Sequence, residues 1–571
     1  MAALTFREQM AGMPIRQMVV VSLIRFSEPL AFTSLFPYMY FMIRDFHVAP
    51  TEQDISKYSG YLASSFAFFQ FLFAVQWGKM SNRVGRKPVL LCGLFGTCIS
   101  LVTFGFSTNY YMALAARSLA GALNGNIAVL RTVIGEICVE RRHQALGFST
   151  LPLLFNFGSI IGPLIGGSAL FTRPNPHSPY EDEHGNTSSL SLSTFGTSWY
   201  DAFVERHPYV MSNIVVSVFL CFSMVIGFFF LEETNENFRQ RRDYGVELGD
   251  AFLARFGVKP PTRPWQKKSD EERPLLHHAE HVSASQVNDF RATAATEDEA
   301  PSGANEIATE EAVIDENDDL DPIPLVSKPM TNAMVRRYSS SSSVFGRTDK
   351  DKTALTGRVI SVIISNCIIS LHSIAYNEFL PVLLASRFQR DLLKFPFRIG
   401  GGFGLDSSYI GTLFSSTGVM GIIIVLVIFP WIDRTLGTIK GFRLSLSFFP
   451  LVYASVPMAI FTLHKYNSAF PSWFTPIFLY SLTTLKTLAS ATGMPQVMLL
   501  NHRAAAKEHR AYVNSLTMSM LALARCLGPI IFGYLMTFGD RHNMAWLVWW
   551  LMALMALCGF LHSFTLDDYE D

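Results

Sequence analysis

The sequence predicts an all-α membrane protein with twelve transmembrane helices in two pseudo-symmetric six-helix bundles. Of its 571 residues, 49% are hydrophobic and only 16% are charged, too few charges to cover a soluble protein of this length. Apolar runs of about 20 residues, long enough to cross a bilayer, recur along the chain. Runs in the first and last parts carry the same short motifs at the same spacings, which indicates an internal duplication.

The apolar runs fall into two sets of six. The first set covers residues 18–43, 58–78, 88–107, 110–134, 143–170 and 209–231. The second set covers residues 357–385, 408–430, 441–463, 472–500, 511–538 and 543–564. The chain therefore divides into an N-terminal tail (1–17), a first bundle (18–231), a linker (232–356), a second bundle (357–564) and an acidic tail (565–571).

An even number of spans places both termini on the same side of the membrane, and the basic residues predict which side. Short loops rich in Lys and Arg stay in the cytoplasm. The loops on the side of the termini carry Lys79, Arg83, Arg86, Lys87, Arg141, Arg142, Arg434, Lys440, Arg443, Arg503, Lys507 and Arg510. Both termini and the acidic tail are therefore expected to be cytoplasmic. One basic cluster, between Arg387 and Arg398, lies on the predicted outer side, where it fits only a rim that attracts ligands.

Two polar insertions interrupt the pattern. Residues 171–208 form a predicted non-cytoplasmic loop, in which Asn186 begins an Asn-Thr-Ser acceptor for glycosylation. Residues 232–356 have too few large apolar residues to fold and are predicted to be a disordered cytoplasmic linker open to phosphorylation. Within it, Glu271, Leu275 and Leu276 fit an acidic dileucine sorting signal, although a chance pair of leucines explains them equally well.

The two halves repeat each other at matching offsets. His143 precedes the Gly162-Pro163 pair by the same nineteen positions that separate His509 from Gly528-Pro529. Glu28 and His372 each lie nine positions before a proline near the end of their span. Several such matches in the same order indicate duplication.

A short basic turn joins the second and third predicted spans. Its residues at fixed offsets are Gly78, Asn82, Arg83, Gly85, Arg86 and Lys87. The turn resembles the G-x-x-x-[DN]-R-x-G-R-K-P motif that the major facilitator superfamily carries at this place, and Asp433 with Arg434 echoes it in the second half. The resemblance implies a secondary transporter whose halves are related by an axis along the membrane normal. It also implies that Glu136 and Glu232 or Glu233 close an inner gate by ion pairs with this turn. Asn82 stands where the family more often has Asp.

The fifth predicted span carries a run of small residues. It contains Gly158, Gly162, Pro163, Gly166 and Gly167. Small residues at this spacing allow helices to pack backbone to backbone, and proline adds a kink. The run resembles the span-five motif of antiporters in the superfamily, so the resemblance implies antiport. Tight packing alone is the simpler interpretation.

Ionisable residues inside predicted spans are candidates for function, because burying a charge in a membrane is costly. They are Arg25, Glu28, Arg117, His372, Glu378, Lys486 and Arg525, and Asn124 is added as a polar neighbour. All but Arg525 lie on spans one, four, seven and ten, which line the central cavity of this fold. Two alternatives remain: Arg25 and Glu28 neutralise each other three positions apart, or Arg117 reaches the outer interface.

Arg117 opens a segment that resembles the span-four motif linked to proton coupling in the family. In this segment and the neighbouring spans, the chain resembles the drug:proton antiporter branch of the superfamily. Within that branch it resembles the zinc-induced-facilitator-like transporters of plants and fungi. The resemblance implies proton-coupled antiport of a small organic molecule, a drug or a metal–chelator complex. Glu28 is the expected carrier of the proton, with His372 as its partner.

The expected energy source is the proton gradient, with no cofactor and no metal site. Expected partners are the substrate, protons and the lipid bilayer, and the protein is expected to work as a monomer in a vacuolar, endosomal or plasma membrane. A net charge of +0 argues against nucleic-acid binding. No catalytic triad or P-loop indicates an enzyme. The alternatives are a membrane sensor that signals through its linker and an uncoupled facilitator.

Overall fold

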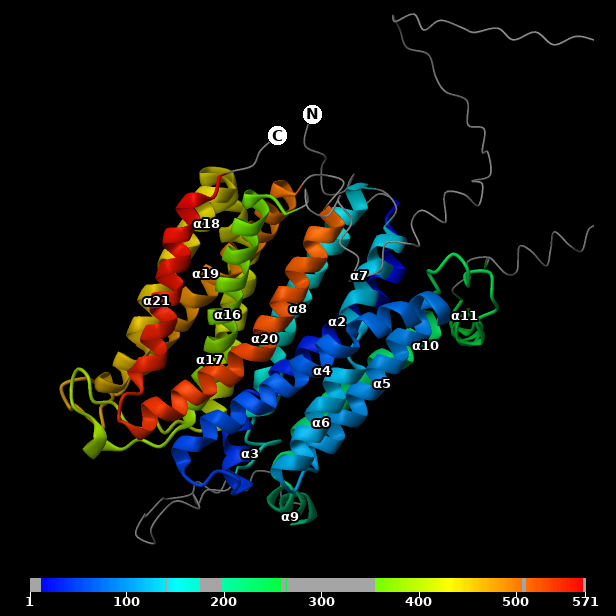
Figure 1. Cartoon of the computed structure of the whole chain (residues 1–571). Coiled ribbons are helices and arrows are strands. Elements are labelled where there is room, and N and C mark those ends of the chain that lie inside the picture. Colours follow the sequence, from blue (N-terminus) through cyan, green and yellow to red (C-terminus); the bar gives the residue numbers. More distant parts are fainter. Residues whose placement is uncertain are drawn as a thin grey trace, which may run out of the picture. The chain divides into compact units, whose positions relative to one another are not determined.

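The computed structural model is almost entirely helical (Figure 1) and describes residues 12–138, 141–174, 198–257, 263, 355–505 and 510–567. All described helices belong to one compact unit formed by Met1–Pro261 and Thr353–Asp571. The first half contains α2 (Ile15–Thr33), α3 (Met39–Asp45), α4 (Ile55–Val84), α5 (Arg86–Gly105), α6 (Tyr110–Leu123), α7 (Asn126–Ile137), α8 (Arg141–Gly167), α9 (Ser198–Arg206), α10 (Val210–Phe230) and α11 (Tyr244–Arg255).

The second half contains α16 (Gly357–Ala385), α17 (Ser407–Ile423), a π-helical turn (Ile424–Ile428), α18 (Phe429–Met458), α19 (Phe474–Ala504), α20 (Arg510–Arg541) and α21 (Trp546–His562). Short 3₁₀ turns stand at Glu52–Asp54, Arg390–Leu392, Ala459–Thr462 and Ser563–Thr565. We call the side where α2 begins and α21 ends the terminal side, and the opposite side the distal side.

The described helices follow all the predicted spans, but several boundaries were wrong. The first span breaks after Thr33, because residues 34–38 form a turn around Pro37 before α3 begins. The fourth span breaks between α6 and α7, where Trp77 packs against Gly125 and donates its indole N–H to the carbonyl oxygen of Ala122 at 2.7 Å. Spans eight and nine join in one helical run that bends at Gly437, whose φ is +72°.

The predicted start of the linker was also wrong. Residues 232–257 are ordered, and α11 lies within them beside the end of α10 (Figure 1). Gly245 and Gly249 let α11 approach the backbone, because a Cβ at either glycine would overlap the carbonyl oxygens of Phe228 or Phe229. Of the rest of the predicted linker up to residue 354, the structure describes only Arg263.

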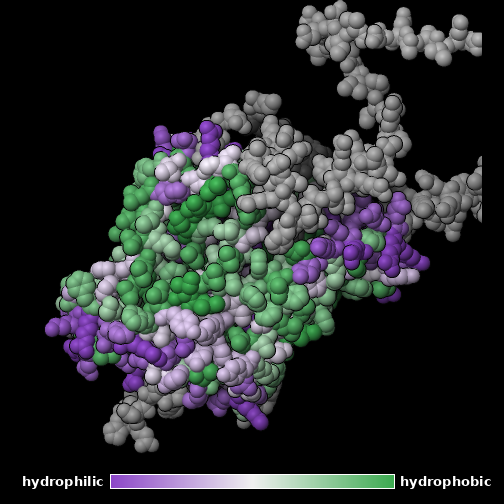
Figure 2. Space-filling model, in the orientation of Figure 1, coloured by the Kyte–Doolittle hydropathy of each residue, from purple (hydrophilic) through white to green (hydrophobic). Residues whose placement is uncertain are grey.

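The surface of the bundle matches a membrane protein. Seven helical stretches in the described ranges are long and apolar enough to span a bilayer, and the apolar part of α8 is shorter. Figure 2 shows a hydrophobic zone across the middle of the helices with hydrophilic residues toward their ends. Large apolar side chains such as Phe222, Leu426 and Leu554 are exposed on the described helical segments, as expected for side chains that contact lipid.

The glycine run of α8 is a packing surface. Side chains at Gly158, Gly162 and Gly166 would overlap atoms of α2 or of Ser34 directly after it, and a side chain at Gly167 would overlap the backbone of α17. Thr33 also donates to the carbonyl oxygen of Gly158 at 3.0 Å. Three of these glycines therefore join helices of the first half, and the fourth lies where the two halves meet.

Candidate functional site

The two halves enclose a central cavity of about 250 Å³. Its wall combines apolar side chains, mostly phenylalanine and alanine, with a few charged groups, which is typical of a ligand site. The polar and charged residues that line it are Arg25, Glu28, Gln70, Thr97, Arg117, Asn124, Asn377, Glu378 and Arg525. Six of these had been predicted as membrane-embedded charges or their neighbour, and the structure brings them together.

The first charged group in the cavity is centred on Glu28. Arg25 forms a short ion pair with its carboxylate, and Asn124 donates to the same carboxylate at 3.2 Å. Arg525, from the opposite half, and Arg131, on α7, lie close enough to interact with Glu28 electrostatically. The predicted neutralisation of Arg25 by Glu28 therefore occurs, but further arginines surround the pair.

The second charged group consists of Arg117 and Glu378. The two residues line the cavity from opposite halves, and their charges attract each other. Arg117 is 6% exposed and lies over the ring of Phe66, with its guanidinium carbon 4.8 Å from the ring centre. It therefore does not reach out to the interface. Glu378 is also 6% exposed, and its Oε2 accepts no hydrogen bond within the described protein.

Two predicted cavity residues lie elsewhere. The His372 side chain is 0% exposed, packs against Phe449 and shares a 2.8 Å hydrogen bond with the hydroxyl of Tyr453. Lys486 donates to Oδ1 of Asn377 at 2.8 Å, behind the cavity wall. The expected partnership of His372 with Glu28 was wrong, because aromatic side chains of α18 enclose the histidine.

The basic turn between α4 and α5 is held by acidic residues of the first half. Gly85 adopts a φ of +116°, and the backbone N–H groups of Arg86 and Lys87 donate to the carboxylate of Glu233 at 2.8 and 3.1 Å. Arg86 forms an ion pair with Glu136 at 3.0 Å, and Lys87 pairs with Asp243 at 2.7 Å.

The remaining residues of the turn differ in their contacts. Arg86 also bonds to Ser81 and to the side chain of Asn82, whereas Arg83 is exposed. The sequence left open whether Glu232 or Glu233 binds the turn. Glu233 binds it, and the backbone N–H of Glu232 donates to the side-chain oxygen of Gln17. The acids described here in contact with Arg86 and Lys87, namely Glu136, Glu233 and Asp243, belong to the first half. In this state these ion pairs therefore organise the first half.

The two halves are joined on the distal side. Arg541 at the end of α20 contacts both carboxylate oxygens of Asp54 at 2.7 and 2.9 Å, and Asp54 is 0% exposed. Thr537 donates to the carbonyl oxygen of Gln53 at 3.1 Å. Ser415 donates to the carbonyl oxygen of Ile160 at 2.7 Å. We call these contacts the distal clamp.

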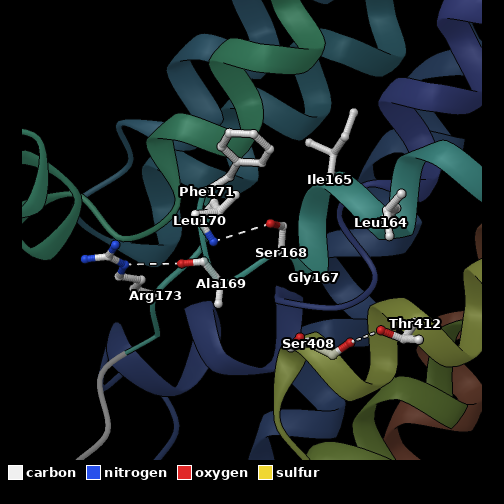
Figure 3. Close-up of a pocket in the computed structure, with 10 residues that line it drawn as sticks. All are labelled: Leu164, Ile165, Gly167, Ser168, Ala169, Leu170, Phe171, Arg173, Ser408 and Thr412. Carbon is white, nitrogen blue, oxygen red and sulfur yellow. Dashed lines mark hydrogen bonds between the residues drawn. The ribbon is translucent and has the colours of Figure 1, made fainter. Parts of the chain in front are cut away.

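A second pocket, of about 420 Å³, lies beside the clamp (Figure 3). The end of α8, with Gly167 and Ser168, forms one wall, and Ser408 and Thr412 of α17 form the other. The polar groups drawn there are bonded locally: Arg173 donates to the carbonyl oxygen of Ala169 at 3.2 Å, and Thr412 donates to that of Ser408 at 2.8 Å. The pocket is thus a gap in the seam between the halves, separate from the charged cavity.

Known proteins that are similar to this chain identify its family and share its fold. The family model for the Major Facilitator Superfamily matches residues 21–181. The chain is 31% identical over 568 residues to the "Major facilitator superfamily multidrug transporter mfsB" of Aspergillus fumigatus, covering 99% of this chain and 85% of that protein. The chain belongs to the major facilitator superfamily. It is a multi-pass membrane transporter and not an enzyme.

Two further comparisons agree with this family. "Protein ZINC INDUCED FACILITATOR-LIKE 1" of Arabidopsis thaliana is 23% identical over 534 residues, covering 94% of this chain and 86% of that protein. The crystal structure of the peptide transporter POT shares the fold with a TM-score of 0.55 and 11% identity, covering 98% of both chains. The predicted resemblance to the drug:proton antiporter branch is confirmed.

Several predicted features of this major facilitator lie outside the described residues. They are the glycosylation candidate Asn186, the sorting candidates Glu271, Leu275 and Leu276, and the end of the acidic tail.

In the second half, Asp433 and Arg434, the counterparts of the basic turn, lie on α18 just before Gly437. Gly437 and Gly85 both have a positive φ. The two segments therefore resemble each other in backbone conformation as well as in sequence.

Sequence analysis missed three polar residues of the cavity wall, Gln70, Thr97 and Asn377. It also missed four charged residues of the site. Asp54 and Arg541 fell in predicted loops between spans, Asp243 fell in the predicted linker, and Arg131 fell in a predicted span without being selected. For Arg131 a signal existed, since it is a charge within the predicted span 110–134. For Asp54 and Arg541 the motifs gave none.

Proposed function

We propose that this transporter is a proton-coupled antiporter that exchanges protons for a small organic molecule, a drug or a metal–chelator complex. The observation that carries the proposal is Glu378, a buried carboxylate in the central cavity with one oxygen that receives no hydrogen bond within the described protein. A titratable group at such a place is costly unless it serves transport. The resemblance of the glycine run of α8 to the antiporter motif supports exchange.

The basic loops support a cytoplasmic terminal side. On that assignment the distal clamp closes the outer side, and the state is inward-facing. Exchange then requires the clamp to open while the terminal side closes, as alternating access between two halves demands. The basic turn with Glu136 and Glu233 is the proposed inner gate of the opposite state.

We assign the coupled proton to Glu378 and not to Glu28. Protonation of Glu28 would remove the charge that its ion pair with Arg25 and its bond from Asn124 stabilise. Glu378 has Arg117 as its charged neighbour and a free oxygen. A substrate that engages Arg117 would leave Glu378 to take up a proton, and release of the substrate would reverse this.

The test is transport in proteoliposomes under an imposed pH gradient, with a panel of anionic, zwitterionic and cationic fluorescent dyes as probes. Glu378→Gln is expected to abolish gradient-driven accumulation and to leave dye counterflow intact, because the proton site is lost while the cavity keeps its shape. Glu28→Gln should weaken accumulation without abolishing it. If Glu28→Gln alone removes the gradient dependence, the proton belongs to Glu28. Counterflow of every dye without gradient dependence in the parent protein would indicate a facilitator.

We further expect a monomer that uses the proton gradient without a cofactor. Its membrane should be vacuolar, endosomal or plasma membrane, with glycosylation at Asn186 if residues 171–208 face away from the cytoplasm.

A further inference from the structure

The charges around Glu28 do not balance. Arg25 on α2 pairs with Glu28, and Arg131 on α7 and Arg525 on α20 interact with the same carboxylate without contacting it. Arg131 interacts electrostatically with both Arg25 and Glu28, and Arg525 interacts with Glu28 and Arg131. The group therefore carries an excess of positive charge, at a depth in the bundle where unpaired charge is costly.

The group spans both halves. Nη1 of Arg131 lies 3.8 Å from the sulfur of Met518 on α20, so α7 and α20 face each other here. Arg525 lies seven positions further along α20, on a similar helical face, and lines the central cavity. A ligand placed between Arg131 and Arg525 would contact the first half and the second half at once.

The guanidinium groups are available to a ligand. Arg131 and Arg525 are exposed although each stands midway along its helix, and Nε of Arg25 is buried with no acceptor within the described protein. The other acid of the cavity, Glu378, faces Arg117. No second carboxylate in the described cavity wall offsets the arginines around Glu28.

We propose that this arginine cluster binds a small organic anion that carries a carboxylate, sulfonate or phosphate group. The proposal rests on the proposed function and names the substrate class of the same cavity. Arginine presents a planar fork that matches the oxygens of these groups in a bidentate manner. Because an anion held by Arg131 and Arg525 contacts both halves, its binding also favours the state in which they approach each other.

The test uses two dyes that share a xanthene core: carboxyfluorescein, an anion, and rhodamine 123, a cation. Binding to the purified full-length protein is measured by fluorescence anisotropy, and movement is measured in proteoliposomes with and without a pH gradient. Carboxyfluorescein should bind the parent protein, and Arg131→Ala or Arg525→Ala should each weaken it by about tenfold or more. Arg525→Lys should retain part of the affinity, since it keeps the charge and loses the fork.

Arg206→Ala is the matched control, because Arg206 is exposed on α9, away from the cavity lining. Failure of carboxyfluorescein to bind the parent protein, or equal binding to the parent and Arg525→Ala, would overturn the anion site. Gradient-driven movement of rhodamine 123 by a parent protein that does not bind carboxyfluorescein would overturn the anion site and leave proton-coupled antiport standing. Binding of carboxyfluorescein that depends on Arg525, with no effect of the gradient on its movement, would support the site and count against proton coupling.

A second inference comes from α11 and is independent of transport. Tyr244, Leu248, Phe252 and Phe256 recur every four residues and are 68%, 59%, 57% and 72% exposed. They therefore form an apolar stripe along one face of the helix. Leaving four such side chains in water would be unfavourable.

The opposite face of α11 is fixed to the bundle. Its glycines pack on the end of α10, Asp250 pairs with Arg16 at 3.5 Å, and the N-cap Asp243 accepts from the N–H of Gly245 at 3.0 Å. The stripe therefore belongs to a docked helix.

The surroundings of the stripe match a membrane surface. The exposed side chains of Phe222, Val225 and Phe228 run along α10 to the end where α11 docks. These side chains belong to the lipid-facing surface of the bundle. The exposed charges near the stripe are mostly basic: Arg239, Arg241 and Arg255 are exposed, Arg242 is paired with Glu247 at 2.8 Å, and Glu236 is the exposed acid of the segment.

We infer that α11 lies in the membrane interface, with its stripe among lipid acyl chains and its arginines near anionic headgroups. The test places the photoreactive amino acid p-benzoylphenylalanine at position 252 or 248 of the full-length protein, in vesicles of phosphatidylcholine and phosphatidylserine. Illumination should give lipid adducts at both positions, several-fold more than at position 247, on another face of the helix. Adducts to another protein copy or to this chain's own residues, in place of lipid, would overturn the assignment.

Discussion

Replacing Gly60 by alanine should hold the distal side open and slow transport strongly. Gly60 lies on α4 directly against α20, and a Cβ there would overlap the carbonyl oxygen of Pro529. Backbone cannot move aside as a flexible side chain can, so the distal clamp would have to loosen. Overpacking of this kind costs about 1–3 kcal/mol, which changes the ratio of the two states by a factor of roughly 5 to 150.

The shift can be measured separately from transport. A cysteine at Ser56, which is 2% exposed beside the clamp, should react with a membrane-impermeant maleimide faster in Gly60→Ala than in the parent. Gly357→Ala, at the start of α16 and outside the basic turn, is the control, because a Cβ there meets nothing within 4 Å. If both variants label and transport like the parent, the contact of Gly60 with Pro529 does not limit the transport cycle.

Sequence patterns predicted those parts of the site that depend on local motifs or on the cost of burying charge. The basic turn was recognised from the spacing of its glycine and basic residues, and Arg86 does contact Glu136. The charges of the cavity could be predicted because Arg117 and Glu378 are rare residues within apolar runs. Both signals are local, so they needed no knowledge of how the two halves pack.

The clamp could not be predicted in this way. Asp54 and Arg541 are separated by 487 positions, and each stands at the end of a helix, where charged residues are ordinary. Their contact depends on the relative placement of the two halves, which no local pattern encodes. The same limit explains the partner of Lys87, since Asp243 lies in a segment that composition assigned to the linker.

Internal symmetry misled the prediction for His372. Its offset from Pro381 matches that of Glu28 from Pro37, so equal depth was expected. Depth along a helix does not determine which way a side chain points. Packing of Tyr453 from α18 against the histidine determines its direction, and the duplicated halves differ there.

Arg86→Ala should lower the turnover of transport far more than the affinity for a ligand. Arg86 is 9% exposed and joins Ser81, Asn82 and Glu136 at the terminal-side ends of α4 and α7. In this state the network lies within the first half, away from the cavity, so its loss should leave the binding site intact. It should change the free energy of the state in which the terminal side closes, and such a change acts on turnover.

A double-mutant cycle separates this role from general destabilisation. Arg86→Ala, Glu136→Ala and the double variant should show a coupling free energy of about 1–3 kcal/mol, the usual range for a hydrogen-bonded charged pair. Lys79→Ala, an exposed cation on the same side of α4, should behave like the parent. Additive effects of the two substitutions, or ligand affinity that falls in parallel with turnover, would mean that the pair supports folding of the first half and does not gate it. A coupled loss of turnover with unchanged affinity is the outcome that the geometry favours, because Glu136 keeps its bond from Thr234 when Arg86 is removed.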